Sequence, residues 1–247
     1  LAAARGFTHL AASLLDANAC VEGTSRKTPL LAAIENGRTE MVDMLISRKA
    51  NIAVTLMMGI TTLHYACQAG FPDIVDSLLE AKADIESENM AGGTPLQSTV
   101  NADVVRRLLE GNANTEKTDA NGTTPLIFQT TQGTTDVVAV LLKSKANVHA
   151  TDSMNNWTAL HWAVATGNPD ITALLLEARA NLELVGTDDR TPLQIAVANC
   201  ANDEARTEVE REEARSEGRP EPPLGASVSA NAEIVAMLKE AQGAMQG

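Results

Sequence analysis

Several features that indicate particular kinds of chemistry are missing from this chain of 247 residues. Lys and Arg number 19 against 32 Asp and Glu, which gives a net charge of −13, and no basic cluster interrupts this acidic excess. Because nucleic acids and anionic membranes are bound through clustered positive charge, neither is expected as the principal partner. The longest apolar stretch, residues 52–60, contains Thr55 and Gly59 and is far too short to insert across a membrane.

The motifs of common enzymes are also missing. The sequence has no nucleophile elbow with a Ser, His and Asp set, no HExxH, no Walker loop and no GxGxxG. We therefore predict a protein that is not an enzyme, with no catalytic, cofactor-binding or metal-binding residues. The three cysteines, Cys20, Cys67 and Cys200, have neither disulfide nor CxxC spacing, which favours an intracellular, cytoplasmic setting.

What the sequence does contain is a short string that recurs at a nearly fixed interval. Thr-Pro-Leu occurs four times, and Thr-Thr-Leu and Thr-Ala-Leu each take the same place once. The leucines of these six copies are Leu30, Leu63, Leu96, Leu126, Leu160 and Leu193. The steps between them are 33, 33, 30, 34 and 33 residues, and such a period indicates a stack of small units that pack on their neighbours.

Each copy carries the signals for two helices. Thr followed by Pro is a helix start, since the Thr hydroxyl can cap the first turn and Pro lacks the N–H that would find no partner there. A short Ala-rich segment predicts an inner helix, a Gly ends it, and a later leucine pair predicts an outer helix. A left-handed residue is expected where the outer helix ends, just before a recurring Ala. That position holds Asn18, Lys49, Lys82, Asn112, Lys145 and Arg179.

A turn, a helix, a Gly and a second helix at about 33 residues, with the pattern T-P-L-H-x-A, resemble the ankyrin repeat. The tetratricopeptide repeat has a similar length, but its Trp, Leu-Gly and Tyr positions are absent here. The resemblance covers essentially the whole chain and implies an all-α solenoid of helix-turn-helix units joined by β-turn or hairpin loops. His follows the leucine only at His64 and His161, where a structural hydrogen bond to the Thr is expected.

The phase of the repeat predicts one domain over residues 1–247. Its repeats are expected at residues 1–21 (partial), 22–55, 56–88, 89–118 (shortened), 119–152, 153–185 and 186–242, with an acidic, Pro-containing insertion at about 201–230. The fourth repeat lacks room for a full inner helix and is expected to be a weak point. The insertion is interpreted as a solvated helical extension followed by a flexible loop, with an acidic docking loop as the alternative. Because the chain starts inside a helix, we expect a monomeric piece of a longer protein.

The resemblance implies that a partner binds on the concave face, which the loop tips and the ends of the inner helices form. Three of the six positions that lie six residues before the repeat leucines are Met, although such loops are usually polar. The apolar candidates for partner binding are Leu56, Met57, Met58, Ile60, Met90, Met154 and Trp157. The polar candidates, at the inner-helix ends, are Glu35, Asn36, Gln68, Thr131, Gln132 and Thr166.

Two interpretations of the apolar tips remain open at this point. They form an exposed stripe for a partner, or some of them fold back and pack on neighbouring tips or inner helices. Tyr65 and Trp162, at equivalent inner-helix positions, are expected in the core. An apolar partner segment flanked by basic residues suits both the stripe and the negative charge. We predict a non-enzymatic interaction scaffold; the alternatives are a regulatory or substrate-targeting region of a larger enzyme or channel, and a mechanical spacer with polar tips.

Overall fold

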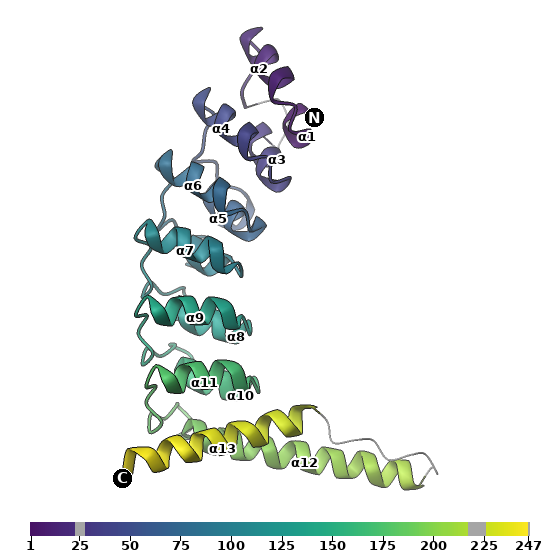
Figure 1. The fold of residues 1–247 in the computed structure, drawn as a ribbon, viewed down its shortest axis with the longest axis vertical. Helices are drawn as coiled ribbons and strands as arrows, with labels where there is room; N and C mark the ends of the chain where they lie inside the picture. The colour runs from purple at the N-terminus through teal and green to yellow at the C-terminus, as the bar shows by residue number, and fades with distance from the viewer. Residues whose placement is uncertain (23–27, 217–225, 247) are drawn as a thin grey trace. The chain divides into compact units, whose positions relative to one another are not determined.

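The computed structural model describes residues 1–22, 28–216 and 226–246, and its regular structure is nearly all helical (Figure 1). Within these ranges the β contacts are two isolated bridges, Thr55 with Thr61 and Thr151 with Thr158. Each bridge closes the base of a loop that leads into an inner helix. The expected all-α solenoid of helix pairs, joined by turn or hairpin loops, is confirmed.

The chain forms two compact units, Leu1–Ala120 and Asn121–Gly247. The helices of the first unit are α1 (Ala2–Arg5), α2 (Thr8–Asp16), α3 (Pro29–Glu35), α4 (Thr39–Ser47), α5 (Thr62–Ala69), α6 (Pro72–Glu80) and α7 (Ala102–Glu110), with the 3-10 turns η1 (Met57–Gly59) and η2 (Pro95–Ser98). Those of the second are α8 (Pro125–Thr131), α9 (Thr135–Lys143), α10 (Ala159–Ala165), α11 (Pro169–Glu177), α12 (Pro192–Ser216) and α13 (Ala226–Gln246).

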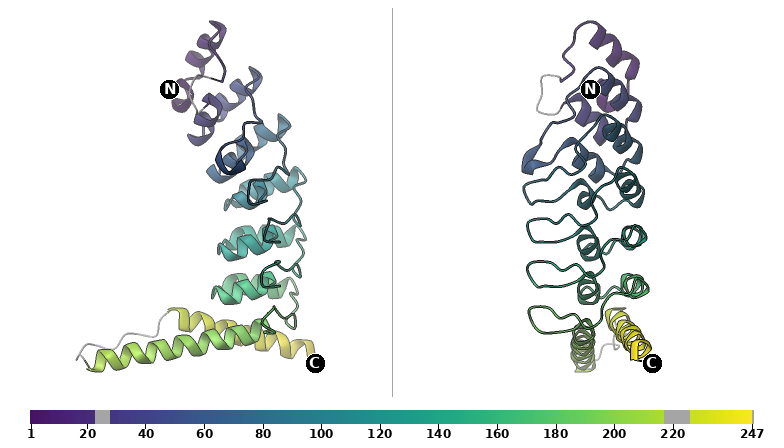
Figure 2. Two further views of the ribbon diagram at one scale, coloured as in Figure 1. Left: turned by 180° about the vertical axis from the view of Figure 1, so that it is seen from behind. Right: turned by 90° about the vertical axis from the view of Figure 1, so that its left-hand side faces the viewer.

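Inner and outer helices stack in two separate columns within each unit (Figure 2). In the first unit the inner elements α3, α5 and η2 pack in series, and so do the outer helices α2, α4, α6 and α7. In the second unit the inner series is α8, α10 and α12, and the outer series is α9, α11 and α13. The first five repeat leucines are buried between these layers: Leu30, Leu63, Leu96, Leu126 and Leu160. Each repeat therefore buries its apolar face on its neighbours.

The predicted start and stop signals of the helices are confirmed. Thr28 Oγ1 accepts a hydrogen bond from the Leu31 N–H, and Thr124 Oγ1 accepts one from the Ile127 N–H. Every residue predicted to be left-handed after an outer helix has a φ angle between 61° and 69°: Asn18, Lys49, Lys82, Asn112, Lys145 and Arg179. Four of these six positions carry Lys or Arg, so long side chains occupy a conformation that Gly adopts at lower cost.

The fourth repeat has lost its inner helix and kept its outer one. Its Thr-Pro-Leu leads into η2, a single turn of four residues, and the chain is extended again at Thr99. Helix α7 still has nine residues, as do α4 and α6. Asn101 caps α7 and also reaches back, since its Nδ2 donates to the Gly70 carbonyl oxygen at 3.0 Å. The missing residues therefore come from the inner side of the repeat.

The last repeat is longer than the others in both of its helices. Helix α12 has 25 residues and α13 has 21, whereas α10 has seven and α11 has nine. The two long helices pack on each other, and the predicted helical extension after Asp203 is the second half of α12. The flexible loop expected after it falls on residues 217–225, outside the described ranges.

Candidate partner-binding surface

Three methionine side chains of the first unit point into solvent from two successive loop tips. Met57, Met58 and Met90 are exposed to 88%, 64% and 77%. Leu56 and Ile60 flank the first tip and are half-buried, and the Leu56 N–H donates to the Ile60 carbonyl oxygen at 2.7 Å. We call these five residues the methionine patch.

The backbone that carries these side chains is fixed by hydrogen bonds between successive tips. In each case an N–H of one tip donates to a carbonyl oxygen of the tip before it. The pairs are Met90 with Met58 (2.9 Å) and Ala120 with Ala91 (2.9 Å) in the first unit, and Ser153 with Asn121 (2.9 Å) and Thr187 with Asn155 (2.8 Å) in the second. Exposed side chains therefore project from an ordered backbone, which lowers the entropic cost of binding.

Close approach of successive tips requires one special backbone position in each tip. The residue four before the repeat leucine has a positive φ angle in every described copy: Gly59, Gly92, Gly122, Asn156 and Asp189. A Cβ atom on Gly59 would lie 2.9 Å from the Met90 nitrogen, and one on Gly92 would lie 2.8 Å from the Ala120 nitrogen. Our interpretation of the sequence did not include this position. Its signal was present, because five of the six copies have Gly, Asn or Asp there, and these types tolerate left-handed geometry.

The second unit presents an aromatic cluster at the tip of its sixth repeat. The rings of Trp157 and Trp162 meet edge to face with centroids 4.9 Å apart, and Trp157 stacks on His161 at 6.0 Å. The Trp157 indole also covers Gly186, where an added Cβ would lie 2.3 Å from the indole Nε1. Trp157 thus folds back onto its own inner helix and the next tip. Like Tyr65 and Trp162, which were expected in the core, it is half-buried.

A buried carboxylate holds this aromatic cluster and its tip together. Asp152 Oδ2 accepts a hydrogen bond of 2.6 Å from Trp162 Nε1. Its other oxygen accepts the N–H groups of Met154 and Asn155 at 3.0 and 2.6 Å. The Met154 side chain next to it remains exposed. We call Asp152, Met154, Trp157, His161 and Trp162 the tryptophan cluster.

The two histidines of the repeat motif have the expected structural role. Thr61 Oγ1 lies 2.8 Å from His64 Nδ1, and His64 Nε2 lies 3.0 Å from the Gly93 carbonyl oxygen. Thr158 and His161 repeat the first of these contacts, also at 2.8 Å. Burial lowers the pKa of both imidazoles. At His64 the hydrogen bond to the Gly93 carbonyl oxygen opposes this shift in part. Both rings are therefore held in the neutral form at neutral pH.

The six polar candidates lie at the ends of inner helices, as expected. Five are exposed and Thr131 is half-buried: Glu35, Asn36, Gln68, Thr131, Gln132 and Thr166. Three of these side chains already donate to carbonyl oxygens of their own helix, Asn36 to Ala32, Thr131 to Phe128 and Thr166 to Trp162. The structure thus gathers the apolar candidates into the methionine patch and the tryptophan cluster. The described contacts do not bring the polar candidates together into a cluster.

Three further properties bear on the chemistry of the chain. Among the described residues, no three His, Cys, Asp or Glu side chains come close enough together to hold a metal ion. The described helices include none with the length and apolar character that crossing a membrane requires. Burial raises the pKa of the Cys67 thiol, which keeps this cysteine protonated.

A family model described as ankyrin repeats (3 copies) matches residues 1–89, 63–152, 97–185 and 133–208. The chain therefore belongs to the ankyrin repeat family. Its structure is similar to the ankyrin repeat domain of Bcl-3, a member of the IkappaB protein family, with a TM-score of 0.68 and 26% identity over 78% of this chain and 91% of that one. The human ASB11 ankyrin repeat domain shares the fold, with a TM-score of 0.71 and 21% identity over 94% of this chain and 95% of that one. Comparison with curated proteins gave no match. Ankyrin repeats generally mediate protein–protein interaction.

Proposed function

We propose that this chain is a non-enzymatic, intracellular scaffold that binds a protein partner through the methionine patch and the tryptophan cluster. The observation that carries the proposal is the exposure of Met57, Met58 and Met90 on tips whose backbones are hydrogen-bonded to one another. A mechanical spacer has no need of exposed apolar side chains at these positions. Methionine is flexible and polarisable, so it adapts to the shape of an apolar partner surface.

The tryptophan cluster adds a second contact of a different kind. Trp157 is packed against its neighbours, yet part of its surface remains open beside the exposed Met154. A large ring that is already held in place loses little conformational entropy when a partner covers it, and Trp is common among residues that dominate binding energy. We therefore assign Trp157 the role of a pre-positioned anchor rather than of a mobile tip residue.

The charge of the chain supports a partner with basic residues next to its apolar segment. At −13 the field around the scaffold attracts cations and speeds their encounter with it. The polar candidates Glu35, Asn36, Gln68, Thr131, Gln132 and Thr166 would supply acceptors for the basic flanks.

The test is a selection from a displayed library of random peptides, followed by affinity measurements on the peptides recovered. We expect them to contain an apolar segment with Lys or Arg beside it. The triple change Met57→Asp, Met58→Asp and Met90→Asp is expected to weaken binding about tenfold or more. Asp tolerates the left-handed geometry of Met58, so the tip can keep its backbone conformation.

The matched control places three Asp residues at exposed apolar positions on other helices. Leu14→Asp, Val209→Asp and Met245→Asp add the same charge far from the tips in sequence, and all three side chains are exposed. Equal affinity of the tip variant and the control variant, both folded by circular dichroism, would rule out the proposed surface.

A further inference from the structure

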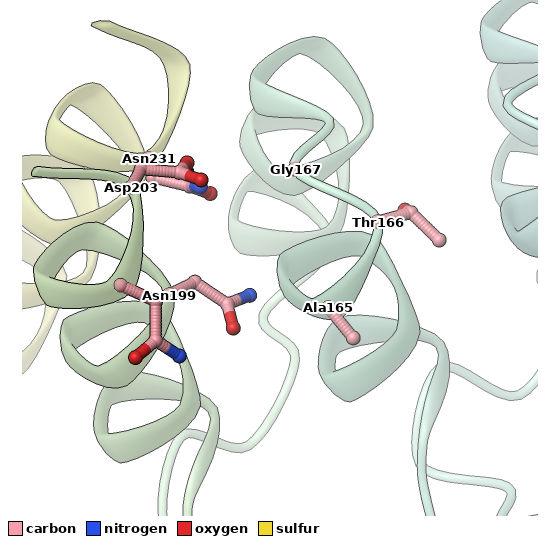
Figure 3. A pocket seen from close by; sticks show the side chains of 7 residues that line it. Ala165, Thr166, Gly167, Asn199, Asp203 and Asn231 are labelled. Carbon is pink, nitrogen blue, oxygen red and sulfur yellow. The ribbon is translucent and has the colours of Figure 1, made fainter. Parts of the chain in front are cut away.

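The second unit contains a polar pocket in its last repeat. It lies where α12 and α13 face the end of α10, and its volume is about 310 Å³ (Figure 3). Its lining residues are Ala165, Thr166, Gly167, Asn199, Asn202, Asp203 and Asn231. Asn202 and Asp203 belong to the insertion, and Asn231 follows it directly, so the insertion supplies part of the pocket lining, including its carboxylate.

One side of the pocket consists of hydrogen-bond acceptors. Asp203 and Asn231 point from α12 and α13 toward Gly167, as Figure 3 shows. Asn231 Nδ2 donates to Asp203 Oδ2 at 2.7 Å, which fixes the amide so that its oxygen faces away from the carboxylate. The carboxylate has room for further donors, since its two oxygens can accept about four hydrogen bonds.

The oxygen of Asn231 is the unusual atom of this pocket. Asn231 is 6% exposed, and its Oδ1 is buried without a hydrogen-bond partner. This oxygen faces Gly167, where an added Cβ would lie only 3.4 Å from it. A buried acceptor without a partner is unfavourable, because it has lost its hydrogen bond to water. A ligand that brings an N–H group between Asp203 and Gly167 would supply the missing donor.

The remaining lining residues come from the end of α10 and from the part of α12 that precedes Asp203. The Thr166 hydroxyl turns back to its own helix, where it donates to the carbonyl oxygens of Trp162 and Ala163. Asn199 is held in place by a hydrogen bond of 3.3 Å from its Nδ2 to the Val164 carbonyl oxygen. Among the described residues that line the pocket, Asp203 carries the single charge, and it is negative.

We propose that this pocket binds the side chain of a Lys or Arg residue of the protein partner. An ammonium or guanidinium group has several donors and a positive charge, which match the carboxylate of Asp203 and the unpaired Asn231 oxygen. A carboxylate or phosphate ligand would be repelled by Asp203. The proposal rests on the proposed function and makes it more specific, because it gives a basic residue of the partner a defined place to bind.

The position of the pocket also predicts a spacing within the partner. Trp157 and the pocket lie at opposite ends of α10, a helix of seven residues and therefore about 10 Å long. An extended peptide advances about 3.3 Å per residue. A basic residue in the pocket is thus expected about three residues from the apolar residue that contacts Trp157.

The pocket can be tested without knowing the partner. The probes are N-acetyl-lysine methylamide, N-acetyl-arginine methylamide and N-acetyl-citrulline methylamide, the last being a neutral analogue of the arginine probe. Each is titrated into the full chain while amide NMR signals are followed. We expect the two cationic probes to shift the Gly167 backbone amide and the Asn199, Asn202 and Asn231 side-chain amides in a saturable manner, and the citrulline probe to leave them unchanged.

Three variants separate the pocket from general electrostatic attraction. Asp203→Asn is expected to weaken binding of the cationic probes about tenfold. Glu204→Gln removes the same charge from the next residue of α12, outside the pocket lining, and is expected to bind as the unaltered chain does. Asn202→Lys changes an exposed lining residue and places a competing ammonium group in the pocket, so it should block the probes even if Asp203→Asn proves unstable.

The results have distinct meanings for the two proposals. Three outcomes would overturn the proposal that the pocket binds a basic side chain. They are equal shifts from the citrulline probe, equal weakening by Asp203→Asn and Glu204→Gln, and the absence of shifts at the pocket amides. Selected peptides that still depend on Met57, Met58 and Met90 would show in that case that the proposed function stands without it. Saturable, Asp203-dependent shifts together with peptides that ignore the methionine patch would show the reverse.

Discussion

The backbone N–H of Met90 donates a hydrogen bond of 2.9 Å to the carbonyl oxygen of Met58. These two residues lie on successive tips and both expose their side chains, so the bond joins the parts of the methionine patch through the main chain. The patch is therefore one surface with a fixed backbone, and its geometry depends on the glycine next to Met58.

Gly59→Ala tests that dependence. The residue has a φ angle of 73°, and an added Cβ would lie 2.9 Å from the Met90 nitrogen. We expect the free energy of unfolding to fall by about 1 to 3 kcal/mol, because the backbone strain and the contact with main-chain atoms cannot both be relieved. Urea denaturation followed by circular dichroism measures this loss. Gly243→Ala in α13, where nothing lies within 4 Å of the added methyl group, is expected to be neutral or slightly stabilising. Similar effects of the two changes would contradict the account of the tip.

Lys145→Gly is expected to stabilise the chain by about 0.5 to 1 kcal/mol. Lys145 has a φ angle of 64°, a conformation that costs a residue with a side chain about 1 to 2 kcal/mol. Gly avoids this cost, but it loses more conformational entropy on folding, so the net gain is smaller. Lys143→Gly makes the same change two residues earlier, in the last turn of α9, and should destabilise by up to about 1 kcal/mol. Denaturation midpoints of the two variants on opposite sides of the unaltered chain would support this explanation, and midpoints on the same side would not.

The two buried histidines predict a loss of stability in mild acid. Burial holds the pKa of His64 and His161 below the ordinary value of 6.5, so the unfolded chain takes up protons that the folded chain resists. Their contribution is complete above pH 6.5 and is lost as the pH falls below that value toward their folded pKa. The free energy of unfolding should therefore decrease between about pH 7 and pH 5.

The chain provides its own non-titrating replacement for these histidines. Gln97 occupies the same position in the fourth repeat, and its Oε1 accepts the Thr94 N–H at 3.0 Å. The double change His64→Gln and His161→Gln is thus expected to keep the caps and to flatten the pH dependence. An unchanged slope in the double variant would mean that other groups, carboxylates above all, determine the acid response.

Asp152→Ala is expected to destabilise the sixth repeat by about 2 to 4 kcal/mol, since it removes three accepted hydrogen bonds and leaves the Trp162 indole N–H without a partner. Trp157 and Trp162 are the two tryptophans of the chain, so intrinsic fluorescence follows this repeat directly. The emission should shift to the red and the fluorescence midpoint should fall. Asp188→Ala, which removes an exposed carboxylate paired with Arg190, is the control and should leave both nearly unchanged.

The sequence predicted local backbone features well because each depends on a few neighbouring residues. A Thr followed by Pro starts a helix in three of its four occurrences and a 3-10 turn in the fourth. The left-handed geometry of Lys49 or Lys82 follows from its place at the end of an outer helix. The inward fold of Trp157 was harder to predict, because it depends on Gly186, which lies 29 residues further along the chain. The polar pocket was out of reach for the same reason: Asp203 meets Asn231 only after α12 and α13 have packed together.

The inner elements of this chain range from the four residues of η2 to the 25 residues of α12, while the outer helices α4, α6, α7, α9 and α11 all have nine. Outside the last repeat, where α13 has 21 residues, the outer helices keep one length while the inner elements differ in theirs. Residues can therefore be added to or deleted from one inner element, which changes the surface at that place, while the outer helices of the other repeats keep their length.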